Sequence, residues 1–140
     1  MNISARLTIA CIAASSLSAC TPMLVKTHPD TPPAKIAKLK SASMKLDNAA
    51  YKTQFSMYAV RQPYGGYGEF VQVGNTWTGF PQQLEMPEGS YLLSVQCATQ
   101  AQFGYIRMPV TLAGGAEYEI SCEPADGRLN SVVGHIKKLN

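Results

Sequence analysis

Three segments in the second half of this 140-residue chain alternate apolar and polar side chains, and this pattern constrains the fold most strongly. Apolar residues occupy every second position of Tyr91–Ala98, Gly104–Leu112 and Glu117–Cys122. A period of two places them on one face of a half-buried β-strand, whereas an amphipathic helix needs a period near 3.6. The alternation therefore predicts β structure from residue 91 to residue 122.

The rest of the chain after residue 53 has the same character. Further strands are expected at Gln54–Gln62, at Glu69–Val73 and within Arg128–Ile136. Turns are expected at Pro63–Gly68, Gly74-Asn75, Met86–Gly89 and Ala113–Gly115, where Gly, Pro or Asn supply the special backbone angles. Six or seven short strands at this spacing predict an all-β fold, a single antiparallel β-sandwich, and we expect Trp77 and Phe80 to pack on its core.

Residues 34–52 have two interpretations. Ile36, Leu39, Leu46 and Ala50 could line one face of a helix, or the segment could hold short strands around Ile36–Leu39 and Met44–Leu46. The β-rich sequence that follows favours strands. The segment also carries five lysines, which could contact anionic lipid or an acidic partner, although a solvated strand face is the more ordinary interpretation. They are Lys35, Lys38, Lys40, Lys45 and Lys52.

The N-terminus has the layout of an export signal, with Arg6 before an apolar stretch from Leu7 to Ala19. Its end, Leu17-Ser18-Ala19-Cys20, resembles the lipobox of bacterial lipoprotein signal peptides. The resemblance implies cleavage before Cys20 and a diacylglycerol and acyl anchor on that cysteine; an ordinary cleaved signal is the alternative. Because Thr21 rather than Asp follows Cys20, the resemblance further implies the periplasmic face of the outer membrane, or the cell membrane if sorting differs.

The expected domains follow from this resemblance. Residues 1–19 form the signal peptide, residues 20–33 form the lipidated cysteine with a disordered proline-rich tether, and residues 34–140 form the sandwich. The tether is expected because Pro22, Pro29, Pro32 and Pro33 fall within residues 21–33. Fully extended, it would lift the domain about 40 Å from the bilayer.

Two cysteines remain in the exported part, Cys97 and Cys122, because Cys11 leaves with the signal and Cys20 takes the lipid. An exported chain with two remaining cysteines suggests a disulfide. Both fall on the apolar faces of their strands, which supports a bridge between facing sheets or between strands that meet on closure. No metal site or cofactor is expected, since His28 and His135 form no ligand spacing with these cysteines.

A second resemblance covers roughly residues 54–137. Leu84–Val95, with Pro87 and Gly89 between two alternating strands, is similar to a pattern of small Ig-like or transthyretin-like sandwiches, including PEGA-type domains. Leu112–Ile120, with its glycines before another strand, completes that pattern. The resemblance implies an adhesive, spacer or assembly module.

The sequence favours binding over catalysis. The formal charge of +3, or +2 without Arg6, lacks the concentrated basic surface of a nucleic-acid binder. His135, even with Asp126 and Ser131 nearby in sequence, makes no recognisable catalytic set. The candidate binding residues are Tyr64 and Tyr67 in a glycine-rich loop, with Trp77 beyond it. The sequence therefore predicts a non-enzymatic, lipid-anchored interaction or structural module whose partner is another envelope protein; the alternative is a peptidoglycan or glycan binder that uses these three aromatics.

Overall fold

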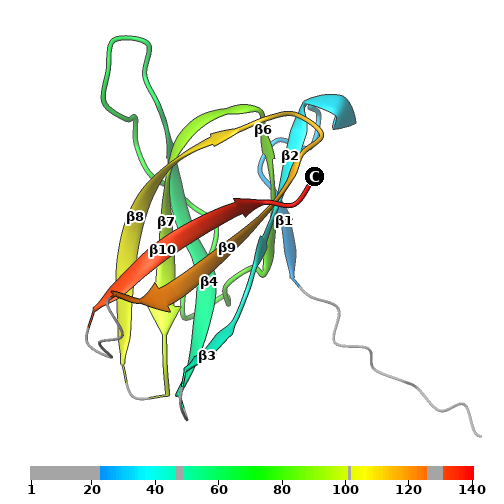
Figure 1. Ribbon diagram of the computed structural model, residues 1–140. Coiled ribbons are helices and arrows are strands. Elements are labelled where there is room, and N and C mark those ends of the chain that lie inside the picture. Colours follow the sequence, from blue (N-terminus) through cyan, green and yellow to red (C-terminus); the bar gives the residue numbers. More distant parts are fainter. Residues whose placement is uncertain (1–22, 47–48, 101, 126–130) are drawn as a thin grey trace, which may run out of the picture.

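The computed structural model describes residues 23–46, 49–100, 102–125 and 131–140. Within these residues the chain is an all-β sandwich of two facing sheets (Figure 1). The described elements are β1 (Leu24–Lys26), the 3-10 turn η1 (Pro33–Lys35), β2 (Ile36–Ser41), β3 (Met44–Leu46), β4 (Ala49–Val60), β5 (Val71–Gln72), β6 (Gln83–Pro87), β7 (Gly89–Ala98), β8 (Phe103–Leu112), β9 (Glu117–Pro124) and β10 (Val132–Lys138).

The first sheet has the order β1-β6-β2-β9-β10, and the second has the order β3-β4-β7-β8 with β5 paired to β4. The expected all-β sandwich is confirmed, and its strand pairs are antiparallel except that β1 runs parallel to β6 and β2 runs parallel to β9. The chain leaves β2 for the opposite sheet, so β2 pairs only with strands distant in sequence, where no hairpin imposes antiparallel pairing. Seven of the described strands have five residues or more, and β1, β3 and β5 are shorter additions.

The alternating segments form the core strands as predicted. The inward residues of β7, β8 and β9 are buried and meet those of β2, β4 and β6 between the sheets. The largest fully buried side chains come from both sheets: Phe55, Leu93 and Val95 from the second, and Leu39, Leu84, Met86 and Ile120 from the first. Segment 34–52 contains β2 and β3, so its strand interpretation is confirmed.

The disulfide between Cys97 and Cys122 is confirmed. Cys97 lies on β7 of the second sheet and Cys122 on β9 of the first, with their Cα atoms 5.8 Å apart. The bridge therefore joins the two sheets through the core, where the cysteines are 4% and 0% exposed.

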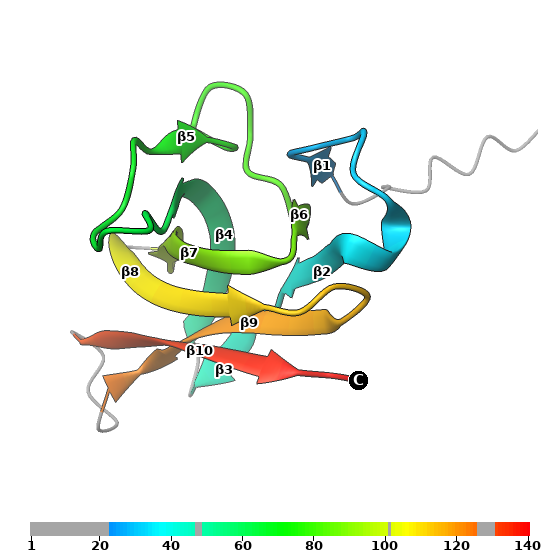
Figure 2. The same ribbon diagram turned by 90° about the horizontal axis from the view of Figure 1, so that it is seen from above.

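One side of the sandwich is closed by β10, which packs beside β8 without a described strand pairing between them (Figure 2). Gly134 allows this contact, because a Cβ there would collide with the Ile106 side chain and come within 2.9 Å of Met108 Sδ. Side chains of β8 therefore pack against the backbone of β10 at Gly134, while no described pairing joins these two strands.

Part of the predicted tether belongs to the domain. Cys20 and the predicted signal peptide lie outside the described residues, but β1 pairs with β6 and η1 follows it, so the expectation of a disordered tether is wrong for residues 23–33. Val25 of β1 packs against the core, and Thr27, directly after β1, donates from its backbone nitrogen and its hydroxyl to the Glu85 carbonyl. Pro33 begins the short 3-10 turn η1 instead of extending a linker. Within the described residues, no helix has the length and apolar character to cross a membrane.

Candidate functional site

The outward face of the second sheet gathers aromatic and basic side chains. Because directly paired residues share a face, the register places Lys52, Ala98 and Phe103 in one row and Gln54, Gln96 and Tyr105 in the next. Met57, Ser94 and Arg107 form the third row. None of these nine positions carries Asp or Glu, so the three rows hold two cations and no anion.

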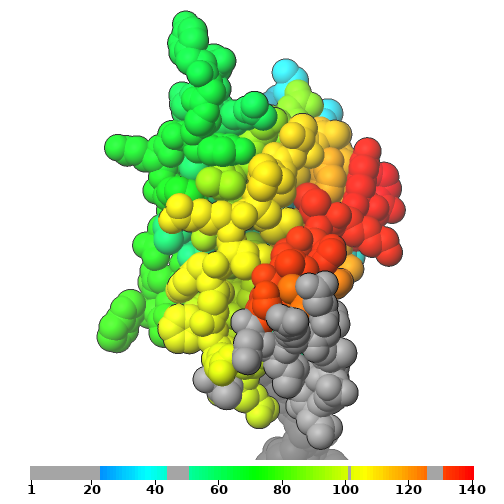
Figure 3. Space-filling model, turned by 60° about the vertical axis from the view of Figure 1, so that its left-hand side comes forward, coloured from blue at the N-terminus to red at the C-terminus, as the bar shows by residue number. Residues whose placement is uncertain are grey.

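Two aromatic contacts organise this surface. The guanidinium carbon of Arg107 lies 4.8 Å from the centroid of the Phe70 ring, a cation–π geometry, although Phe70 comes from the loop before β5. Phe103 and Tyr105 form an edge-to-face pair with centroids 6.3 Å apart, and the Gln96 amide donates to the Tyr105 hydroxyl at 3.4 Å. Phe103 and Tyr105 are nevertheless 70% and 51% exposed. We call Lys52, Gln96, Phe103, Tyr105, Arg107 and Phe70 the basic–aromatic face; Figure 3 views β8, in yellow, between green loop segments and red β10.

The outward face of the first sheet carries charges of both signs. Its rows alternate in sign: one reads Lys26, Glu85, Lys38, Glu117 across β1, β6, β2 and β9, and the next contains Lys40, Glu119 and Lys137. The ammonium of Lys26 lies 3.6 Å from a carboxylate oxygen of Glu85. Lys38 therefore lies beside glutamates of both neighbouring strands and Lys40 beside Glu119 of β9, which accounts for the lysines of β2 as a solvated strand face.

The two loop tyrosines lie on a hairpin-like loop that projects beyond β4. Arg61 bridges to Tyr67, and the Gln62 backbone nitrogen donates to the Gly66 carbonyl, so the loop folds back on itself (Figure 1). Tyr64 at its tip is fully exposed, and Tyr67 is exposed to 36%.

Trp77 lies on a separate turn and is 95% exposed, so the expectation that it packs on the core is wrong. The turn is closed by reciprocal backbone hydrogen bonds between Asn75 and Gly79. The Asn75 side-chain oxygen accepts from the backbone nitrogens of Trp77 and Thr78, both at 2.8 Å. Gly79, and not Gly74, has the positive φ that the turn requires. The hydrogen bonds made by Asn75 fix the turn with residue 77 on its outer side.

The three predicted aromatics do not share one surface. Tyr67 pairs beside Arg61, whereas the Trp77 turn begins next to Ser56, whose carbonyl accepts from the Gly74 nitrogen. Five residue steps of β4 separate these points, a distance of about 17 Å along the strand. A sugar ring cannot contact both ends, so a common stacking site is not formed.

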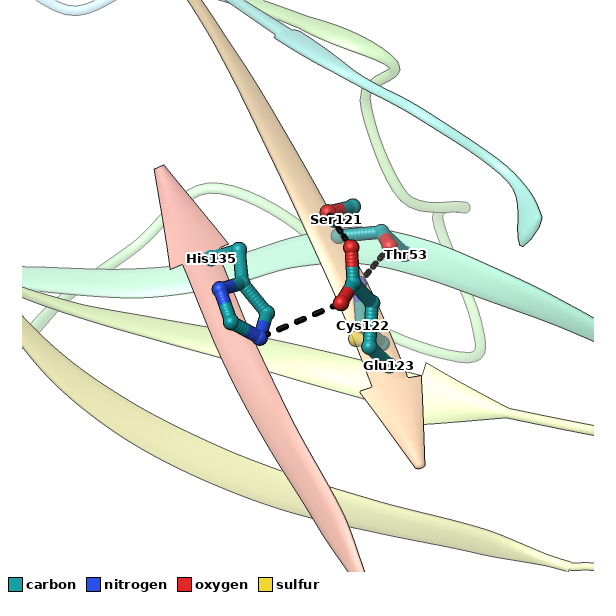
Figure 4. A network of polar contacts seen from close by, with 5 residues as sticks. All are labelled: Thr53, Ser121, Cys122, Glu123 and His135. Carbon is teal, nitrogen blue, oxygen red and sulfur yellow. Dashed lines mark hydrogen bonds and ion pairs between the residues drawn. The ribbon is translucent and has the colours of Figure 1, made fainter. Parts of the chain in front are cut away.

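A polar network lies around His135 (Figure 4). Its Nε2 is 3.2 Å from a Glu123 carboxylate oxygen, and the Ser121 hydroxyl donates to the other oxygen at 3.5 Å. Ser121 thus bonds the carboxylate, and the serine–histidine contact that activates a nucleophile is not formed among the described residues. Asp126 lies outside them. They also contain no cluster of three metal-ligating side chains.

Sequence reasoning missed the basic–aromatic face, although part of its signal was readable. Phe103, Tyr105 and Arg107 occupy the outward positions of the same alternating strand whose inward positions predicted the core. Three large or charged residues at every second position of a solvent face form a pattern that the sequence already displays. Phe70 could not be placed, because its contact with Arg107 depends on the path of a loop.

Comparisons of the chain with protein-family models, with curated proteins and with solved structures found no match.

Proposed function

We propose that this chain is a non-enzymatic lipoprotein of the bacterial envelope, anchored through lipid on Cys20, whose sandwich binds the acidic surface of another envelope protein. The lipobox resemblance supports the anchor and the periplasmic side of the outer membrane. The disulfide Cys97–Cys122 supports an oxidising compartment.

The observation that carries the binding role is the contrast between the two outward faces. The first sheet pairs its lysines with glutamates, whereas the basic–aromatic face holds Lys52 and Arg107 with no acidic residue in its rows. Arg107 has no carboxylate partner among the described residues and rests on an aromatic ring. Arginine and exposed aromatics are the residues that dominate binding energy at protein interfaces.

An interaction through this face is better supported than strand addition at its edge. Proline at position 109 of β8 offers no backbone N–H to an added strand, and β10 packs beside that edge. The free edge of β10 carries Lys137 and Lys138, which discourage pairing with another strand.

The test uses a photo-crosslinking amino acid at position 105 in living cells, with the same group at position 119 as the matched control on the opposite face. We expect a single protein adduct from position 105 that disappears in the Arg107→Glu variant and persists in Lys40→Glu. Equal adducts from both positions would refute the assignment. Crosslinks to cell-wall glycan in place of protein would favour the peptidoglycan-binding alternative.

A further inference from the structure

We propose that Trp77 is an interfacial membrane anchor that holds the lipidated domain in one orientation against the bilayer, an inference that rests on the proposed lipidation of Cys20. The relevant surface is the turn Asn75–Gly79 together with Met23 and Leu24 at the start of β1.

The first argument is the length of chain between the lipid and the domain. The described structure begins at Met23, which is three residue steps after Cys20. Fully extended, three steps span at most about 11 Å. Whatever lies beside Met23 is therefore held at the bilayer surface, because the acyl chains of Cys20 are buried in it.

The second argument is that the Trp77 turn lies beside Met23. The backbone nitrogens of Gln82 and Gln83 donate to the Met23 carbonyl at 3.0 and 3.2 Å. Met23 Sδ lies 3.9 Å from the position that a Cβ of Gly79 would occupy. Figure 2 shows the connection after β5 arching on the same side of the molecule as β1.

The third argument is chemical. Residues 71–84 contain no Asp, Glu, Lys or Arg, and neither do residues 20–25, so both segments can enter the headgroup region without desolvating a charge of their own. Met23 and Leu24 are exposed beside the turn. Tryptophan is enriched at membrane interfaces, where its ring meets acyl chains and its indole N–H meets polar headgroups.

The turn is built to present this side chain. The two hydrogen bonds to Asn75 Oδ1 and the reciprocal bonds between Asn75 and Gly79 fix the backbone on both sides of Trp77. A fixed turn loses little conformational freedom when its side chain enters the interface. The exposure of Trp77 on this fixed turn is accounted for when the bilayer interface covers its side chain.

The experiment uses the fact that Trp77 is the only tryptophan in the chain. Full-length lipidated protein is reconstituted into phosphatidylethanolamine–phosphatidylglycerol vesicles, with or without lipids brominated on their acyl chains, and tryptophan emission is recorded. We expect bromine to quench the emission roughly twofold or more, because the ring lies at the depth of the interface. Unchanged emission from protein that floats with the vesicles would overturn the orientation while leaving the lipid anchor intact.

The matched control moves the tryptophan to the other exposed tip by combining Tyr64→Trp with Trp77→Tyr. Position 64 lies at the far end of β4, so its tryptophan should escape quenching, and equal quenching at both positions would overturn the proposal. Mass analysis of the N-terminal peptide examines the premise separately. An unmodified Cys20 would refute the lipid anchor and, with it, this orientation.

Discussion

Removing the disulfide should destabilise the domain by an amount that follows from its position in the chain. Cys97 and Cys122 are separated by 25 residues. In the chain-entropy model, opening a loop of that size lowers the free energy of the unfolded chain by about 3.5 kcal/mol at 25 °C. The variant Cys97→Ala/Cys122→Ala also loses two buried sulfur atoms, so the cost should be at least this large.

Urea unfolding measures this cost directly. With an m-value of about 2 kcal/mol per M, the midpoint should fall by roughly 1.8 M in the double-alanine variant. Wild-type protein that is unfolded, reduced and refolded in reductant should show most of the same shift, because it loses the cross-link and keeps both sulfurs. Reductant should not affect the variant, which has no bridge to open.

A midpoint within about 0.5 M of the wild type would refute the reasoning, because it would leave less than about 1 kcal/mol for the cross-link. It would mean that the unfolded chain already holds β7 near β9 without the bridge. A large shift in the variant alone, absent from reduced wild type, would instead assign the effect to lost packing.

Two further changes test individual contacts. Thr53 accepts the buried N–H of Cys122 at 2.9 Å, so Thr53→Val should cost about 1–3 kcal/mol in urea unfolding while Thr53→Ser retains most of the stability; equal losses would contradict this role. Burial first, and then the neighbouring Tyr58, raises the pKa of Tyr91, so the folded state keeps its proton at pH values where the unfolded state releases it. Stability should therefore be unaffected by this group below pH about 10 and should fall as the pH rises from there through the raised pKa. The variant Tyr91→Phe should show a smaller alkaline loss in the same assay, and an unchanged pH profile would contradict the assignment.

The core strands could be predicted because their signal is local. Burying one face of a strand requires alternation, so the positions of Leu93, Val110 and Ile120 could be inferred without knowing their partners. The same alternation of inward and outward positions placed Cys97 and Cys122 inside the sandwich. A shift of one residue in the alternation of either strand would have exposed its cysteine.

The order of strands could not be predicted, because it depends on contacts between distant segments. The local sequence predicts that β2 is a strand. Its position between β6 and β9, however, follows from the chain changing sheets after Ser41. That change also explains Thr53: β2 no longer reaches Cys122, and a side chain of β4 accepts its N–H across the sandwich (Figure 4). Such a bond leaves no pattern in the sequence.

The error over the tether has a physical cause with consequences for function. Proline density predicts a solvated linker when the backbone has no other partner. Here β6 offers a free edge, and Leu24–Lys26 can pair with it in three residues, bury Val25 and place Lys26 against Glu85. The maximum height of the domain's first residue above a lipidated Cys20 therefore falls from about 40 Å to about 11 Å. With Cys20 lipidated as proposed, a domain held that close cannot present all of its surfaces equally, and we expect the uncharged segments beside Met23 to face the bilayer.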